Sequence, residues 1–93
     1  MEMNRVAGSD RGQVRLFTLS TCIWCKKTKA LLKDLEVAYQ YVDVDLLRGE
    51  EREKALTELK QFNPLCSFPS LVVGDACIVG FDEAKIKEAL KGQ

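Results

Sequence analysis

Hydrophobic residues change their spacing along this chain, and the changes predict where its strands lie. Residues 14–19 and 39–44 are short runs of apolar, aromatic and β-branched side chains, which is the pattern of strands. Residues 71–73 and 77–79 form two more such runs, and a turn signal that begins at Gly74 separates them. The pattern therefore predicts four strands, of which the last two form a hairpin.

Three other segments repeat apolar residues every three or four positions, which predicts amphipathic helices. They are residues 24–35, residues 45–61, and a last segment that follows Asp82 as its cap. A strand, a helix and a strand within about thirty residues predict a parallel βαβ unit with a right-handed crossover. The whole order, β-α-β-α-β-β-α, predicts an α/β fold in which three helices flank a four-stranded mixed sheet.

The start of the chain does not share this periodicity. Residues 1–12 mix glycine with small polar residues, so we interpret them as a flexible tail. The remainder, residues 13–93, is expected to be one domain, because a chain of 93 residues has the length of a single domain with a single core.

Charge and hydropathy exclude some classes of partner. Fourteen basic and fourteen acidic residues cancel, so no net field attracts nucleic acid or an anionic membrane. No apolar run approaches the roughly 18 residues that cross a membrane, and the start of the chain lacks the apolar segment of a signal peptide. We expect a monomeric protein of the cytoplasm whose four cysteines are reduced.

Two cysteines three positions apart indicate the chemistry. Cys22 and Cys25 lie where the first strand pattern gives way to the first helix pattern, which places Cys22 at a helix N-terminus. The free N–H groups and the positive dipole end of a helix stabilise an anion, so we expect Cys22 to be a thiolate and the attacking nucleophile. Cys25 lies one turn further along the same face, from where it can displace a mixed disulfide formed at Cys22.

A Cys-x-x-Cys pair can also be half of a metal site, and Cys66 and Cys77 bring the thiols to four. Ten residues separate those two cysteines, however, and the chain has no histidine. Structural zinc sites usually bring a second closely spaced pair of ligands. The spacing favours redox chemistry over structural zinc or an iron–sulfur centre, and we predict no metal site.

The order of elements and four short motifs resemble glutaredoxins, small redox proteins of the thioredoxin-fold superfamily. The motifs are residues 21–25, 42–45, 68–73 and 79–82. The resemblance implies a thiol–disulfide oxidoreductase that reduces disulfides in proteins, or mixed disulfides with glutathione, through its Cys-x-x-Cys motif. It also implies that the electrons come from glutathione or from a flavin disulfide reductase, and that no bound cofactor is required.

The resemblance further implies a substrate groove beside the two thiols. In the family, the proline that matches Pro69 follows a cis peptide bond and faces the dithiol, where the neighbouring backbone pairs with a bound substrate. The residues expected to bind substrate or glutathione are Trp24, Phe68, Pro69, Gly80, Phe81 and Asp82. An aromatic side chain between two reactive thiols offers a flat apolar surface to a ligand, and packing over the loop is the alternative for Trp24.

Three residues depart from the usual glutaredoxin pattern. Ile23 replaces the proline common between the cysteines, a change that in the family can accompany a [2Fe–2S] cluster held between two monomers. An iron–sulfur carrier is therefore the alternative function. Leu19 replaces a basic residue that pairs with a glutathione carboxylate in the family. Val79 replaces a glycine, and the Gly80-Phe81 pair after it is similar to redoxins that draw electrons from a flavin reductase.

Cys66 stands three residues before Pro69, so the predicted fold brings its loop near the dithiol. We consider it an auxiliary thiol that could form a second disulfide, and an ordinary half-buried cysteine is the alternative. Cys77 opens a strand, and we interpret it as structural.

Overall fold

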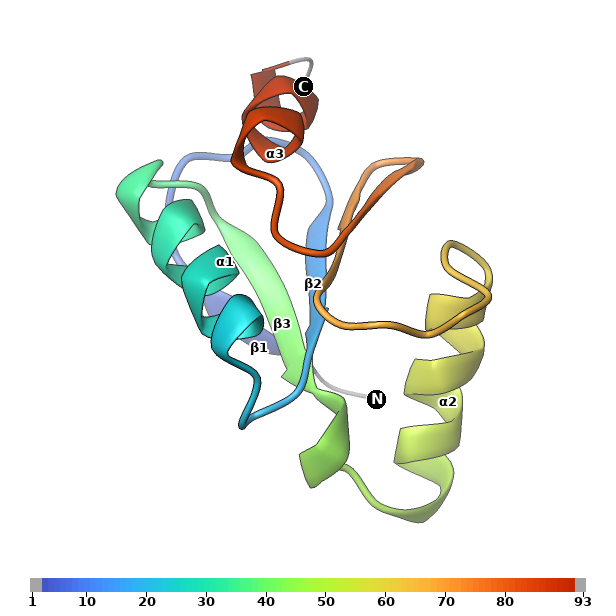
Figure 1. Ribbon diagram of the computed structural model, residues 1–93. Helices are drawn as coiled ribbons and strands as arrows, with labels where there is room; N and C mark the ends of the chain where they lie inside the picture. Colours follow the sequence, from blue (N-terminus) through green and yellow to red (C-terminus); the bar gives the residue numbers. More distant parts are fainter. Residues whose placement is uncertain (1–2, 92–93) are drawn as a thin grey trace.

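The computed structural model describes residues 3–91 as a single five-stranded mixed sheet with helices on both faces (Figure 1). The strands follow the order β1-β3-β2-β4-β5 across the sheet. Residues 1–2 of the expected tail and residues 92–93 of the expected domain lie outside the described residues.

The elements alternate much as the hydrophobic pattern predicts. The strands are β1 (Asn4–Val6), β2 (Val14–Thr18), β3 (Tyr39–Asp43), β4 (Ser70–Val73) and β5 (Ala76–Val79). The helices are α1 (Ile23–Asp34), α2 (Gly49–Lys60) and α3 (Glu83–Lys91), and a short 3-10 helix, η1 (Val44–Leu46), follows β3. β2 and β3 are parallel and α1 connects them, so the predicted βαβ unit and the α/β class are confirmed.

The N-terminal segment joins the sheet, which corrects the expected count of four strands and the interpretation of residues 1–12 as a tail. β1 pairs antiparallel with β3, with Arg5 opposite Gln40. Ser9 forms a further bridge with Val37. β1 has only three residues and one of them is apolar, so it pairs through the backbone groups at the free edge of β3. Such pairing leaves almost no trace in the hydrophobic pattern.

The second helix begins at Gly49, later than the expected start of the segment 45–61. η1 occupies the first part of that segment. Gly49 has a φ of 57°, a left-handed value that glycine adopts without steric cost, and the chain turns there at the first residue of α2.

The helices cover opposite faces of the sheet because side chains alternate along each strand. In β2, Leu16 packs with Leu32 of α1 and Ile86 of α3. Its neighbour Phe17 points to the other face and packs with Leu59 of α2. All five side chains are fully buried, and each contributes roughly 1.5–3 kcal/mol relative to an exposed position. Figure 1 shows α1 and α3 on one side of the sheet and α2 on the other.

The fold brings several chain segments together at one edge of the sheet. Because β2 and β3 are parallel, their C-terminal ends both lie at this edge. β4 runs antiparallel to β2, with Phe17 opposite Ser70, so β4 begins at the same edge directly after Pro69. The short loop after β2 leads into α1 there; Cys22 ends this loop and Cys25 lies in the first turn of α1.

Candidate active site

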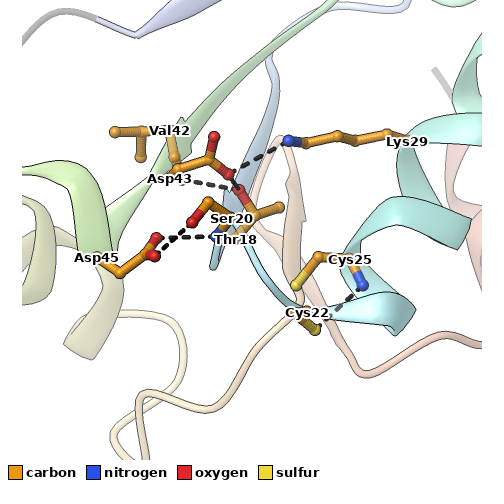
Figure 2. Close-up of polar contacts among 8 residues, drawn as sticks. All are labelled: Thr18, Ser20, Cys22, Cys25, Lys29, Val42, Asp43 and Asp45. Carbon is orange, nitrogen blue, oxygen red and sulfur yellow. Dashed lines mark hydrogen bonds and ion pairs between the residues drawn. The ribbon is translucent and has the colours of Figure 1, made fainter.

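Cys22 occupies the N-cap position of α1, the helix terminus that the sequence predicts. Its backbone is extended, with φ −80° and ψ 119°, and its Sγ accepts a hydrogen bond from the backbone N–H of Cys25 at 3.2 Å (Figure 2). The Cys22 N–H donates to the Leu19 carbonyl at 3.1 Å, which fixes the loop between β2 and α1. A sulfur that accepts an N–H bond at a helix N-terminus is stabilised as an anion.

The environment of Cys25 differs from that of the half-buried Cys22. It is fully buried, and burial raises the pKa of its thiol to about 12. A hydrogen bond with the Cys22 sulfur raises that pKa as well, whereas the Leu19 backbone and the charge of Lys29 lower it. Cys25 therefore keeps its proton at neutral pH, while Cys22 is half-buried and open to a partner. The two thiols differ in the way that an attacking and a resolving thiol must.

A carboxylate that follows β3 holds the loop in front of Cys22. Asp45 Oδ1 accepts a hydrogen bond from the Ser20 N–H at 2.8 Å, and Asp45 Oδ2 accepts one from the Ser20 hydroxyl at 2.5 Å (Figure 2). Both bonds favour the ionised form and hold the pKa of Asp45 below its usual value. Our sequence reasoning missed Asp45. One signal could have found it: Asp45 is an acidic residue just after β3, and β3 runs parallel to β2, the strand that leads into the dithiol.

A second carboxylate, at the end of β3, joins β2 to α1. Asp43 Oδ1 accepts a hydrogen bond from the Thr18 hydroxyl at 2.6 Å and pairs with Lys29 Nζ at 3.2 Å. The Val42 carbonyl lies 3.0 Å from the same hydroxyl, but a hydroxyl has one proton and the shorter contact is with Asp43. The Lys29 ammonium also lies 4.1 Å from the ring centroid of Tyr41. Sequence reasoning missed this set too.

Trp24 forms an exposed aromatic surface next to the cysteines. Its side chain is 52% exposed, and its ring stacks on Phe81 with centroids 6.2 Å apart and an interplanar angle of 27°. Lys27 Nζ lies 4.5 Å from the centre of the Trp24 ring. The Trp24 ring therefore packs on a neighbour and keeps an exposed face, and its contact with a ligand stays a prediction.

Two predicted groove segments meet through a backbone hydrogen bond. The peptide bond between Phe68 and Pro69 is cis, as the resemblance implies. The Gly80 N–H donates to the Pro69 carbonyl at 2.8 Å, and the φ of 80° at Gly80 is in the left-handed region. Pro69 is fully buried, whereas Phe68 is half-buried against the α2 face of the core.

Asp82 has a structural role at the start of α3. Its Oδ1 accepts a hydrogen bond from the Lys85 N–H at 3.1 Å, which is the geometry of an N-cap. Asp82 is half-buried, and its contact with a ligand stays a prediction.

The two remaining cysteines belong to the α2 side of the core. Cys66 and Cys77 are half-buried and pack against the same cluster as Phe68. Cys66 has a φ of 50°, in the left-handed region, and its N–H donates to the Asn63 carbonyl at 2.9 Å. Burial raises the pKa of Cys77. Among the contacts of residues 3–91, none joins Cys66 to the dithiol, so its auxiliary role stays a prediction.

Neither a metal-ligand cluster nor a membrane span stands out in the described part of the chain. Within residues 3–91, no three cysteine or acidic side chains gather closely enough to hold a metal ion. In the same range, no helix has the length and apolar character needed to cross a membrane.

Comparison with known proteins agrees with this fold. The family model named Glutaredoxin matches residues 14–78, which is more than half of the sequence. The chain belongs to the glutaredoxin family. The thioredoxin-like fold implied by the resemblance is therefore confirmed.

This glutaredoxin is similar to two archaeal proteins of known structure and to a bacterial one known by sequence. The glutaredoxin of Methanosarcina mazei is 53% identical, with a TM-score of 0.89 over 95% of this chain and 86% of that one. The methanoredoxin of Methanosarcina acetivorans is 52% identical, with a TM-score of 0.85 over 89% of this chain and 88% of that one. Glutaredoxin 1 of Rickettsia felis is 32% identical over 83 residues, which cover 84% of this chain and 80% of that protein.

Proposed function

We propose that this glutaredoxin is a dithiol–disulfide oxidoreductase that reduces disulfides in proteins, with Cys22 as nucleophile and Cys25 as resolving thiol. The observation that supports this most is the contrast between two sulfurs on one helical turn. Cys22 Sγ caps the helix and accepts the Cys25 N–H, whereas Cys25 is buried and protonated. A reachable sulfur at a helix N-terminus beside a protected thiol suits a two-step exchange.

The reaction consists of two thiol–disulfide exchanges. In the first, the Cys22 thiolate attacks one sulfur of the substrate disulfide, forms a mixed disulfide, and releases the other substrate sulfur as a thiolate. In the second, Cys25 gives up its proton and attacks Cys22 Sγ, so the remaining substrate sulfur leaves as a thiolate. The substrate gains two electrons and the protein is left with a Cys22–Cys25 disulfide. A donor thiol or dithiol then reduces that disulfide.

We infer that the substrate lies along the exposed face of Trp24 and the backbone around Pro69. Trp24 is next to Cys25 in sequence and its ring is held by Phe81, so it offers a preformed apolar surface. The hydrogen bond from Gly80 to the Pro69 carbonyl fixes the two backbone segments relative to each other. A fixed surface costs less conformational entropy on binding than a mobile one.

The sequence argues for testing two kinds of electron donor. Leu19 stands where many glutaredoxins have a basic residue for a glutathione carboxylate, so one anion contact is lost. The relative from Methanosarcina acetivorans is named a methanoredoxin, which supports testing donors besides glutathione. We propose a glutathione-type thiol or a flavin disulfide reductase as donor.

We also propose that the protein works as a monomer in a reducing compartment such as the cytoplasm. One chain supplies both reactive thiols, so the exchange needs no second copy. A reducing compartment keeps thiols reduced, and the proposed exchange begins from the reduced dithiol. Light scattering of the reduced protein tests the monomer, and a stable dimer would contradict it.

Two variants test the assignment of roles. Cys22→Ser removes the nucleophile, and we expect it to abolish the reduction of a model protein disulfide. Cys25→Ser keeps the nucleophile but removes the resolving thiol, so it is expected to accumulate mixed disulfides that mass spectrometry detects. A Cys66→Ser/Cys77→Ser double variant is the matched control and should retain activity. Full turnover by Cys22→Ser would overturn the proposal.

The donor and the alternative function are tested with the unmodified protein. Parallel turnover assays contain glutathione and its reductase in one vessel and a thioredoxin-type reductase in the other, and the faster vessel identifies the donor. Anaerobic reconstitution followed by iron analysis measures cluster binding. Inactivity in both vessels, together with stoichiometric iron, would replace the oxidoreductase with the iron–sulfur carrier.

A further inference from the structure

Lys29 is a charged group on the same helix face as the resolving thiol. It follows Cys25 by four positions in α1, and positions four apart are neighbours on a helix surface, with roughly 5–6 Å between their Cβ atoms. Its side chain is only 26% exposed, whereas Lys33 one turn later is an exposed lysine. Lys29 therefore differs from the solvated lysines around it.

Two neighbours hold the Lys29 ammonium in place. Asp43 Oδ1 lies 3.2 Å from Nζ, and the Tyr41 ring centroid lies 4.1 Å from it. Asp43 is itself fixed, because it accepts the Thr18 hydroxyl at 2.6 Å from the strand that leads into the dithiol loop (Figure 2). A lysine with two such contacts, one of them to a fixed carboxylate, loses most of its freedom to swing into solvent.

The resolving step needs a nearby positive charge. Cys25 attacks only as a thiolate, and burial disfavours the thiolate of a fully buried cysteine. In the reduced protein, the charges that bear on Cys25 are the Cys22 sulfur, which opposes its ionisation, and Lys29, which favours it. In the mixed disulfide the Cys22 sulfur is uncharged, so the favourable charge of Lys29 is the one that remains. A cation is worth more in a partly buried site than in water, because the effective dielectric constant is lower.

We propose that Lys29 is a positioning residue for the second exchange: its anchored ammonium stabilises the thiolate that forms at Cys25 as Cys25 attacks the Cys22 mixed disulfide. This role rests on the proposed function. Lys29 takes no proton and touches no substrate. The proton of Cys25 leaves to solvent, the S–S bond to the substrate breaks, and a new S–S bond joins the two cysteines.

The expected effect follows from the chemistry of thiols. Neutralising Lys29 raises the pKa of Cys25, and a fall of about tenfold in its thiolate fraction is the size of effect that we expect below that pKa. The intrinsic nucleophilicity of the thiolate rises by about threefold at the same time, since it increases with pKa with a coefficient of roughly 0.4–0.5. The second exchange therefore slows by about threefold while the first is unchanged.

A nitrobenzoate disulfide with a coloured thiolate product separates the two exchanges in one stopped-flow trace. Attack by Cys22 releases the first coloured thiolate at a rate proportional to the reagent concentration. Attack by Cys25 then releases the second at a rate independent of it, and the reagent gains two electrons as the protein forms its disulfide. The measurement uses the full chain with Cys66→Ser and Cys77→Ser, so that no other thiol contributes.

Four variants in this background test the role of Lys29. In Lys29→Gln and Lys29→Met, the second phase is expected to slow about threefold and to recover when the pH rises by roughly half a unit, with an unchanged first phase. Lys29→Arg keeps the charge and should restore the second phase. Lys33→Gln removes an equal charge one turn away and should match the unsubstituted protein.

The two neutral variants guard against a folding defect, since Met retains packing against Tyr41 and the first phase reports an intact Cys22 site. A second phase unchanged in both neutral variants would overturn the role of Lys29. Equal slowing in Lys33→Gln, or parallel slowing of both phases, would also overturn it. Absence of the first phase, with no coloured thiolate released by the unsubstituted protein, would instead overturn the proposed function, and this role with it.

Discussion

The contrast between the two thiols predicts selective alkylation of the reduced protein. Burial raises the pKa of Cys25 from an ordinary 9.0 to about 12, so its thiolate fraction falls about a thousandfold at any pH below 9. The stronger nucleophilicity of a more basic thiolate recovers roughly twentyfold of this. At neutral pH, iodoacetamide should therefore modify Cys25 about fifty times more slowly than an ordinary cysteine, before steric protection by its burial is counted.

Peptide mass spectrometry after a short pulse of iodoacetamide at pH 7 measures this selectivity. We expect Cys22 to carry the label and Cys25 to remain a thiol. The same pulse on protein unfolded in urea is the control, because the environments of the two residues then become alike and both should react. Labelling of Cys25 at the rate of Cys22 in the folded protein would refute the assignment of the buried thiol as resolving thiol.

The pH dependence of this protection has a definite sign. A raised pKa keeps Cys25 protonated until the pH approaches 12, so its reactivity must grow as the pH rises. Between pH 7 and pH 9 the thiolate fraction of Cys25 increases about a hundredfold, since both values lie below its pKa. A rate of Cys25 labelling that is flat across this range would contradict the raised pKa, provided that circular dichroism shows an intact fold.

Three further substitutions test other parts of the molecule. Trp24→Ala removes the ring that stacks on Phe81, and we expect the KM for a protein disulfide to rise about fivefold, which corresponds to about 1 kcal/mol, while urea unfolding changes little. A change in kcat alone would contradict this. Asp45→Asn weakens the hydrogen bonds to Ser20 and should slow the labelling of Cys22 by iodoacetamide. Because the pKa of Asp45 is lowered, its carboxylate stays ionised down to a pH below the usual pKa range of an aspartate, so acid should have the effect of the variant only below that range. An Asn variant that labels normally would remove Asp45 from the site. Leu59→Ala should lower the free energy of unfolding by about 2–5 kcal/mol in urea titrations, and a loss below 1 kcal/mol would mean that the α2 face is loosely packed.

Much of the fold could be predicted because its core elements carry their own hydrophobic period. Side chains of β2 alternate between the two faces of the sheet, with Leu16 on one face and Phe17 on the other, and α1 repeats its apolar residues at helical spacing. Both elements could therefore be predicted from the sequence. β1 could not be found in this way, since three residues with one apolar side chain have no period. The start of α2 was misplaced for a related reason: Gly49 and η1 interrupt a segment whose charges still follow a helical pattern.

The candidate site also has one part that local sequence predicts and another part that it does not. The cysteines were predictable, because a strand that ends before Cys-x-x-Cys and a helix that follows it fix the position of Cys22 from local sequence. The contacts that surround them join residues far apart in the chain. Asp45 reaches Ser20 across 25 positions and Asp43 reaches Lys29 across 14, and no short motif contains either pair. Only the parallel pairing of β2 with β3 brings these side chains to one edge.

The pairing of β3 with β2 also explains how β1, which the sequence did not predict, supports the candidate site. In a sheet of four strands, β3 would be the exposed edge, and an exposed edge strand is free to fray or to pair with other chains. β1 covers this edge from Asn4 to Val6, so β3 lies between two partners. β3 ends at Asp43, and Asp45 follows two residues later, which means that both carboxylates of the site depend on the position of this strand. The N-terminal segment thus stabilises the strand that positions the Cys22 loop and Lys29, although it contributes no residue to the chemistry.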